Sequence, residues 1–222
     1  MGAFFIAGAG TDIGKTYVTA ALARRIRARG GAVRVLKPVV SGVPALDDPA
    51  FAASDTAILL AAAGLPVDQA HVEACSPWRF AAALAPDRAA AAEGRDPGLA
   101  EVMGWCRARL ADAAPDETML IEGAGGLMSP LTREATVLDW LVALDCPVIL
   151  VAGSYLGAIS HALTAIEVIR ARRVPLHAVV VSESLDSAGL SETVDALVRF
   201  APGVPIVPLG RGETGLAGLT EP

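Results

Sequence analysis

Short apolar runs recur along the chain, and Gly, Pro or Asp bounds each of them. Runs of this length, rich in Val, Ile and Leu, predict strands that are buried on both faces of a sheet. We place these strands at residues 3–7, 33–36, 119–121, 148–152, 178–181 and 204–207.

Longer segments with a helical period separate most of these runs. They lie at residues 15–29, 99–110, 137–144, 159–172 and 190–200. Strands that alternate with helices predict an α/β fold with a mostly parallel central sheet, right-handed crossovers and helices on both faces.

Residues 38–97 break this alternation. The segment carries several prolines, an Ala-rich helix candidate at residues 55–63 and no convincing strand. We interpret it as a long, partly helical insertion, which is either a binding segment or an Ala-rich surface lobe. The sequence has no repeat and no linker, so residues 1–222 are expected to form a single domain.

Composition narrows the possible partners and the compartment. The chain has 222 residues, 53% of them hydrophobic, and a net charge of -6, which argues against nucleic acid as a partner. The apolar run at residues 3–7 is too short for a signal peptide, and no run is long enough to cross a membrane. Cys75, Cys106 and Cys146 lie far apart, so we expect no zinc site, no disulfide framework and a cytoplasmic location.

The strongest motif lies between the first strand and the first helix and reads Gly8-Ala9-Gly10-Thr11-Asp12-Ile13-Gly14-Lys15-Thr16. Small residues let backbone N–H groups turn toward phosphate oxygens, and the helix N-terminus adds its dipole. Lys15 would reach the β- and γ-phosphates, and the Thr16 hydroxyl would bind Mg²⁺. The motif therefore predicts a phosphate-loop NTPase fold.

The loop is a variant, because the strict pattern GxxxxGK[ST] requires glycine at position 9, where this chain has Ala9. A chance Gly-Lys pair in a turn is the alternative, but the preceding strand and following helix argue against it. The later loops contain no Asn/Thr-Lys-x-Asp motif for guanine, so ATP is the expected nucleotide.

Two strand ends supply further candidates. Lys37 ends the second strand and Glu122 ends the third, and ligands of open parallel sheets bind beyond the carboxyl ends of strands. A second cation would offset charge that develops during phosphoryl transfer, and an acidic residue would bind Mg²⁺. The alternatives are a solvated lysine and an exposed glutamate in a Gly turn.

Other polar residues have simpler interpretations. Asp55 is typical of the first turn of a helix. Residues 157–161 are typical of the start of a helix, where free N–H groups favour anions. The residues alone favour the capping interpretation for both. His71, His161 and His177 have no metal-ligand spacing, and we assign them no role.

Taken in order, these motifs resemble the dethiobiotin synthase family. The family's GTDTxVGKT is similar to residues 8–16, its KPVxSG to residues 37–42 and its Ser-Asp to residues 54–55. Its VEGAGG is similar to residues 121–126, and its PVILV-x-G-x-x-LG-x-I-x-H to residues 147–161. The ordered set spans most of the chain.

The resemblance implies a homodimeric ligase of biotin biosynthesis that closes a cyclic urea on 7,8-diaminononanoate with CO₂ and MgATP. A substrate carbamate attacks the γ-phosphate, and the second amine then attacks the resulting carbamic phosphoric anhydride and expels phosphate. Lys15 and Lys37 would stabilise the reacting charges, and Thr16, Asp55 and Glu122 would hold Mg²⁺.

The resemblance also implies the remaining contacts by position. Nucleotide contacts would come from Asp12, Ile13, Gly14, Lys15, Thr16, Tyr17, Glu122, Gly123, Ala124, Gly125 and Ser182. Substrate contacts would come from Thr11, Ser41, Gly157, Ala158, Ile159 and Ser160, the last four binding the substrate carboxylate of the partner subunit. Ser182 stands where the family often has the Asn that recognises the base.

Two alternatives share the phosphate loop. A ParA- or MinD-type positioning ATPase would carry an extra Lys near the loop start, where this chain has Gly10, and no basic amphipathic tail is present. A cobyrinate-type amide synthetase has similar Gly-Lys-Thr and Glu-Gly-Ala-Gly motifs, but normally adds a glutaminase domain for which this chain has no room.

Overall fold

A computed structural model describes residues 2–213, 215–216 and 219. The strands are β1 (Ala3–Gly8), β2 (Ala32–Leu36), β3 (Val39–Ser41), β4 (Trp78–Phe80), β5 (Glu117–Glu122), β6 (Val148–Ala152), β7 (Leu176–Ser182) and β8 (Ile206–Leu209). The helices are α1 (Lys15–Ala28), the 3₁₀ helix η1 (Pro49–Ala53), α2 (Asp55–Ala63), α3 (Gln69–Cys75), α4 (Pro86–Ala92), α5 (Leu99–Ala111), α6 (Val137–Leu144), α7 (Ala158–Ala171) and α8 (Leu190–Phe200).

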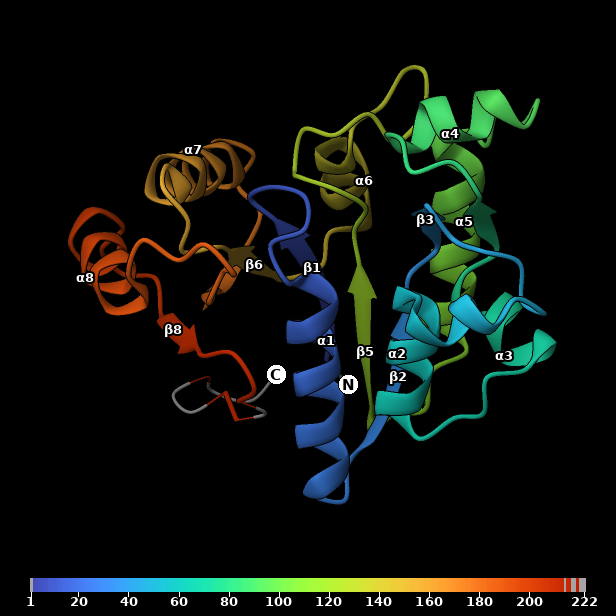
Figure 1. The fold of residues 1–222 in the computed structure, drawn as a ribbon, viewed down its shortest axis with the longest axis horizontal. Coiled ribbons are helices and arrows are strands. Elements are labelled where there is room, and N and C mark those ends of the chain that lie inside the picture. The colour runs from blue at the N-terminus through green and yellow to red at the C-terminus, as the bar shows by residue number, and fades with distance from the viewer. Residues whose placement is uncertain (1, 214, 217–218, 220–222) are drawn as a thin grey trace.

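The described residues form a six-stranded sheet in the order β2-β5-β1-β6-β7-β8 (Figure 1). Each pairing between neighbouring strands of this sheet is parallel. The predicted α/β fold with a mostly parallel central sheet is therefore confirmed. Because β1 lies at the centre, the loop that follows it opens at the middle of the sheet edge.

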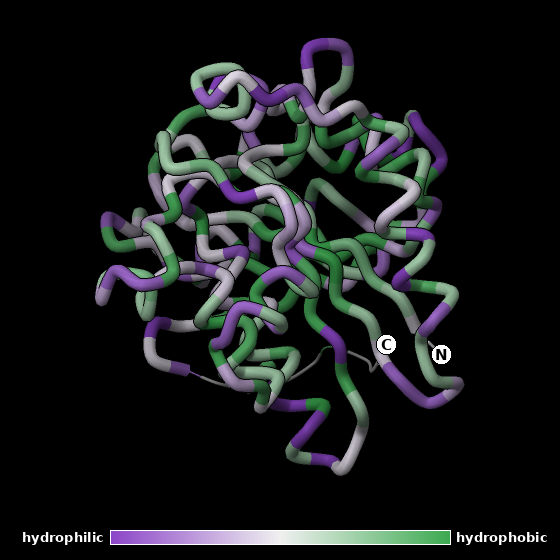
Figure 2. Tube along the Cα trace, turned by 90° about the vertical axis from the view of Figure 1, so that its right-hand side faces the viewer, coloured by the Kyte–Doolittle hydropathy of each residue, from purple (hydrophilic) through white to green (hydrophobic). Residues whose placement is uncertain are grey.

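Alternation along the strands divides the core into two layers. Phe5 and Ala7 of β1 face a cluster that includes side chains of α5, α6, α7 and α8. Phe4 and Ile6 face a second cluster that includes side chains of α1, α2 and α3. Helices therefore cover both faces of the sheet. In Figure 2 several of the outer turns of the trace are hydrophilic, and long hydrophobic stretches lie farther in.

The prediction of no strand within residues 38–97 is wrong. β3 and β4 lie in this segment and pair in parallel as a separate two-stranded sheet, from Val39 beside Trp78 to Ser41 beside Phe80. The predicted helix at residues 55–63 is confirmed as α2. Both short strands add apolar side chains to the main core, so the insertion packs on the central sheet.

The last strand begins two residues later than predicted. β8 covers Ile206–Leu209 rather than residues 204–207, and it is an edge strand. An edge position tolerates Pro208, since a residue with no N–H group needs no partner on the open side. Among the described residues, none of the helices is long and apolar enough to cross a membrane.

Candidate active site

The phosphate loop follows β1 and ends at Gly14, which has φ 91° and directly precedes α1. No side chain caps this helix start and no acidic residue lies in its first turn, so its N–H groups can bind an anion. The Lys15 ammonium folds back over the loop and donates to the Gly10 carbonyl at 3.1 Å. The loop therefore has the conformation that the motif predicts.

The structure explains why alanine is tolerated at position 9. A Cβ atom on Gly8 would lie 2.8 Å from the Gly10 carbonyl oxygen and 2.9 Å from the Lys15 side chain. Gly8 is thus the position that requires glycine, whereas the Ala9 N–H continues the sheet by donating to the Val151 carbonyl at 2.9 Å.

Three segments that are distant in sequence meet beside this loop. The Lys37 ammonium forms an ion pair with Glu122 at 2.7 Å and another with Asp55, and it lies 3.4 Å from the Thr16 hydroxyl oxygen. The Thr16 hydroxyl donates to Glu122 Oε1 at 2.7 Å. Lys37 and Glu122 are buried, and the Asp55 side chain is 41% exposed. The strand-end argument placed Lys37 and Glu122 correctly.

Burial and charge act in opposite directions on these groups. Burial lowers the pKa of Lys15, and the neighbouring Lys37 lowers it further against the opposing effect of Glu122. Burial also lowers the pKa of Lys37, but Glu122 and Asp55 outweigh it, so this pKa lies above its ordinary value. Burial raises the pKa of Asp55, and Lys37 more than offsets this effect, so that the carboxylate stays ionised.

Lys15 and Lys37 are the two lysines of the chain, and all other basic side chains except the histidines are arginines. A lysine offers a compact ammonium whose charge depends on its surroundings, whereas an arginine stays charged and is planar. Within one site, the pKa of Lys15 is therefore lowered and that of Lys37 is raised.

A cavity of about 340 Å³ collects most of the predicted reacting groups. Its lining includes Thr11, Asp12, Gly14, Lys15, Thr16, Lys37, Ser41, Asp55, Ala124 and Gly125. Glu122 and Gly123 do not line this cavity: Glu122 is fully buried, and the Gly123 N–H donates to the Ile6 carbonyl at 3.0 Å. The Ser41 hydroxyl donates to the Leu84 carbonyl at 2.7 Å.

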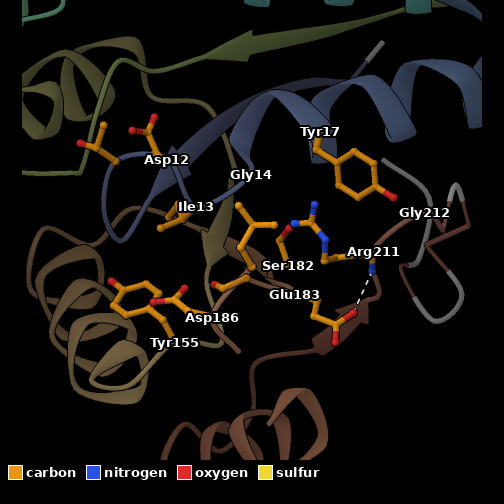
Figure 3. Close-up of a pocket in the computed structure, with 13 residues that line it drawn as sticks. Asp12, Ile13, Gly14, Tyr17, Tyr155, Ser182, Glu183, Asp186, Arg211 and Gly212 are labelled. Atoms are coloured by element: carbon orange, nitrogen blue, oxygen red, sulfur yellow. Dashed lines mark hydrogen bonds between the residues drawn. The ribbon is translucent and has the colours of Figure 1, made fainter. Parts of the chain in front are cut away.

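A second cavity of about 600 Å³ adjoins the other side of the loop (Figure 3). Its predicted members are Thr11, Asp12, Ile13, Gly14, Tyr17 and Ser182, and the sequence analysis missed Tyr155, Glu183, Asp186 and Arg211. The Glu183 carboxylate accepts a hydrogen bond from the backbone N–H of Arg211 at 2.9 Å. Most of the missed residues follow the ends of β6, β7 and β8, so the strand-end rule could have found them. The size and the position beside the phosphate loop suit a nucleoside.

The predicted helix start at residues 157–160 belongs to α7 and lines neither cavity. Gly157 has φ 99°, and no side chain caps the helix. Gly157 and Ser160 are exposed, Ile159 is partly buried and Ala158 is buried. The loops beside it expose Leu156 and Leu185, which are 90% and 85% exposed.

The residues around Lys37 also suit a hard divalent cation. The described residues contain no group of three or more His, Cys, Asp or Glu side chains that could hold a metal ion. Instead, Thr16, Asp55 and Glu122 present oxygen atoms around one point, where they share the Lys37 ammonium. Mg²⁺ is commonly held by one or two carboxylates together with phosphates of the substrate, and this set matches that pattern.

Comparison with known proteins gives consistent results. A sequence-family model described as an AAA domain matches residues 2–208. The ATP-dependent dethiobiotin synthetase BioD of Methylobacterium nodulans is 61% identical over 213 residues, which are 96% of this chain and 94% of that protein. The protein of the same name from Caulobacter sp. (strain K31) is 48% identical over 218 residues, 98% of this chain and 92% of that protein.

Solved structures share the fold. The signal recognition particle receptor FtsY of Elizabethkingia anophelis superposes with a TM-score of 0.56 at 18% identity, covering 99% of this chain and 61% of that one. The MinC:MinD cell division complex of Aquifex aeolicus gives a TM-score of 0.51 at 12% identity, covering 95% of this chain and 81% of that one. At such identities the likeness concerns the fold alone.

Proposed function

The chain belongs to the ATP-dependent dethiobiotin synthetase family, and from that premise we propose how its two cavities divide the reaction between them. It is an ATP-dependent ligase of biotin biosynthesis. The alternatives of a positioning ATPase and a cobyrinate-type synthetase are not supported, because the relatives at 61% and 48% identity over nearly the whole chain are dethiobiotin synthetases, and the MinD likeness extends only to the fold.

The proposed reaction closes a cyclic urea on 7,8-diaminononanoate with CO₂. One substrate amine, converted to a carbamate, attacks the γ-phosphate of ATP through a carbamate oxygen, and ADP leaves. The second amine attacks the carbonyl carbon of the carbamic phosphoric anhydride and expels phosphate. Two charged intermediates thus form beside the phosphate loop, where cations are required.

The observation that carries this proposal is the meeting of Lys15, Lys37 and Asp55 at one cavity, with the buried Glu122 paired to Lys37 behind it. Lys15 would bind the β- and γ-phosphates, and Lys37 would hold the carbamate oxygens. Ser41 and Thr11 would orient the diamine. Both lysine ammonium groups are buried, so their interactions with developing negative charge are weakly screened.

We propose that Thr16, Asp55 and Glu122 hold Mg²⁺. The ion would supply charge neutralisation at the β- and γ-phosphate oxygens. Thr16 and Asp55 line the cavity, Glu122 lies buried beside them, and oxygen atoms of all three surround the Lys37 ammonium, which supports the assignment.

The nucleoside would occupy the larger cavity, where the Tyr17 ring and Ser182 would contact it (Figure 3). The Tyr17 hydroxyl donates to the backbone carbonyl of Glu213 and lies 3.3 Å from that of Gly210. This anchors the segment after β8 against α1 and fixes one wall of the cavity.

We predict weaker discrimination among nucleoside triphosphates than in a relative with asparagine at position 182. An amide can pair with adenine through two hydrogen bonds, worth about 1–3 kcal/mol of discrimination, whereas a serine hydroxyl forms fewer. Values of kcat/KM for ATP, CTP and GTP should therefore lie within about tenfold of one another. Ser182→Asn should widen the gap, and a strong preference for ATP in the unaltered chain would contradict the prediction.

We propose a homodimer in which the α7 start of one protomer binds the substrate carboxylate at its partner's cavity. The uncapped N–H groups and the neighbouring exposed side chains of Leu156 and Leu185 support this arrangement.

We also propose that residues 1–222 act as one domain in the cytoplasm. The buried, unpaired thiols of Cys75, Cys106 and Cys146, whose pKa values burial raises to about 11, 12 and 11, suit a reducing compartment.

The deciding experiment incubates the protein with diaminononanoate, bicarbonate and MgATP and follows phosphate release and cyclic product together. Both should appear in equal amounts, and both should require the diamine. ATP hydrolysis that ignores the diamine and responds to DNA or lipid would refute the proposal.

A further inference from the structure

Thr19 lies in α1, one turn beyond Lys15, and is fully buried. Its hydroxyl oxygen lies 2.7 Å from Glu122 Oε2 and 2.9 Å from the Lys15 carbonyl oxygen. The motifs along the chain gave this residue no role. Its position against a buried carboxylate suggests one.

The two oxygens of Glu122 have different partners. Oε1 accepts from the Thr16 hydroxyl and the Lys37 ammonium, both at 2.7 Å. Among the described residues, Oε2 accepts from the Thr19 hydroxyl. The hydrogen bond to Oε2 therefore opposes rotation of the carboxylate about its terminal bond, and it leaves Oε1 on the side of the cavity.

The geometry of the sheet explains why these groups meet. Glu122 pairs with Ile6 in the register of β5 with β1, and Ile6 and Leu120 face the layer that contains α1. Glu122 is two residues beyond Leu120 and so points to the same face. Thr16 and Thr19 are three residues apart on α1 and lie on one side of that helix.

The Thr19 hydroxyl has one proton and two acceptors within reach. A threonine in a helix commonly donates to the carbonyl four residues earlier, which here is that of Lys15. The shorter distance to Glu122 and the charge of a carboxylate favour donation to Glu122 instead. A buried carboxylate oxygen without a donor would also be costly.

We propose that Thr19 is a positioning residue that fixes the rotation of Glu122, so that Oε1 faces Thr16, Lys37 and the metal ion. This inference rests on the proposed metal-binding role of Glu122. Residues that orient a metal ligand from behind typically change metal affinity by about 10–100-fold when they are removed. Thr19 is fully buried and lines neither cavity, so it acts through Glu122.

The test measures Mn²⁺ binding by electron paramagnetic resonance in the presence of the β,γ-methylene analogue of ATP, so that no turnover is needed. Thr19→Val keeps the shape and removes the hydroxyl, and it should weaken Mn²⁺ binding by about 10-fold or more. Thr19→Ser keeps the hydroxyl and should stay within about threefold of the unaltered chain. If the valine variant does not fold, Thr19→Ala takes its place.

A double-variant cycle with Glu122→Gln separates positioning from packing. Once Glu122 is replaced, Thr19→Val should cause little further loss of Mn²⁺ binding, since the two residues act as a unit. Equal Mn²⁺ binding by Thr19→Val and the unaltered chain would overturn the inference, as would a serine variant as weak as the valine variant. An unaltered chain that binds no Mn²⁺ with the analogue, or forms no cyclic product, would instead refute the proposed function.

Discussion

Replacing Lys37 with alanine is expected to lower the rate of cyclic urea formation by about 10²–10³-fold, because a preorganised charge in a buried site is lost. Phosphate release and product formation should fall together when both are followed with diaminononanoate, bicarbonate and MgATP. The variant should remain folded but melt at a lower temperature. Breaking the buried pair with Glu122 costs about 3–5 kcal/mol and leaves Asp55 without its cation.

Arg34→Ala provides the matched control. Arg34 lies on β2, the strand that Lys37 directly follows, and forms an ion pair with Glu117 at 2.8 Å, away from the cavity. A partly exposed pair of this kind contributes about 1 kcal/mol or less, so activity should be unchanged. Undiminished turnover by Lys37→Ala would remove Lys37 from the proposed chemistry.

Gly14→Ala is expected to weaken nucleotide binding by roughly 10–100-fold. Gly14 has φ 91°, which costs an L-residue about 1–2 kcal/mol. A Cβ atom here would also overlap the Ser182 hydroxyl oxygen and lie 3.1 Å from Ser182 Cβ. Rotation of the Ser182 side chain relieves the first contact but not the second, so the backbone has to shift where α1 begins, and this start carries Lys15 and Thr16. Calorimetric titration with the β,γ-methylene analogue of ATP measures the change.

Gly30→Ala separates backbone strain from the steric clash. Gly30 has a similar φ of 81°, but an added Cβ atom meets nothing within 4 Å. This control should lose about 1 kcal/mol of stability and no nucleotide affinity. Replacing Ser182 with glycine as well should restore part of the binding to Gly14→Ala. If the two alanine variants bind nucleotide equally well, the loop does not need the close contact.

Local patterns predicted the central sheet because each of its strands is a continuous apolar run or is flanked by a strong helix. The two short strands were missed for a physical reason. β3 and β4 have three residues each, too few for a periodic signal, and they pair across a gap that contains α2 and α3. Long-range pairing of this kind leaves no mark on either segment alone.

The site was predictable where a residue ends a strand of the central sheet. Lys37 and Glu122 follow from that rule, since the carboxyl ends of neighbouring parallel strands meet at one edge. Asp55 did not follow from it. Ser54 caps α2 by accepting the Ala57 N–H at 3.2 Å, so the first turn of α2 gives Asp55 an ordinary explanation. Only the resemblance to the family indicated a role for Asp55.

Thr19 was missed because its partner is distant in sequence. A threonine inside a helix usually indicates only local hydrogen bonding, and nothing near it suggests a carboxylate 103 residues later. The helix period gives the face of α1 on which Thr19 lies. The register of β5 against β1 gives the facing residue, and that register becomes known only from the three-dimensional structure.

The presence of only two lysines makes this chain unusually suited to chemical labelling. Acetic anhydride reacts with uncharged amines, and in a protein with many lysines it marks many surface sites. In this chain both lysine side chains border one cavity. Burial lowers the pKa of Lys15, while Glu122 and Asp55 raise that of Lys37 against the effect of burial. Acetylation should therefore reach Lys15 before Lys37, and bound nucleotide should slow it. Peptide mapping by mass spectrometry would then report how much of the phosphate loop is occupied by nucleotide.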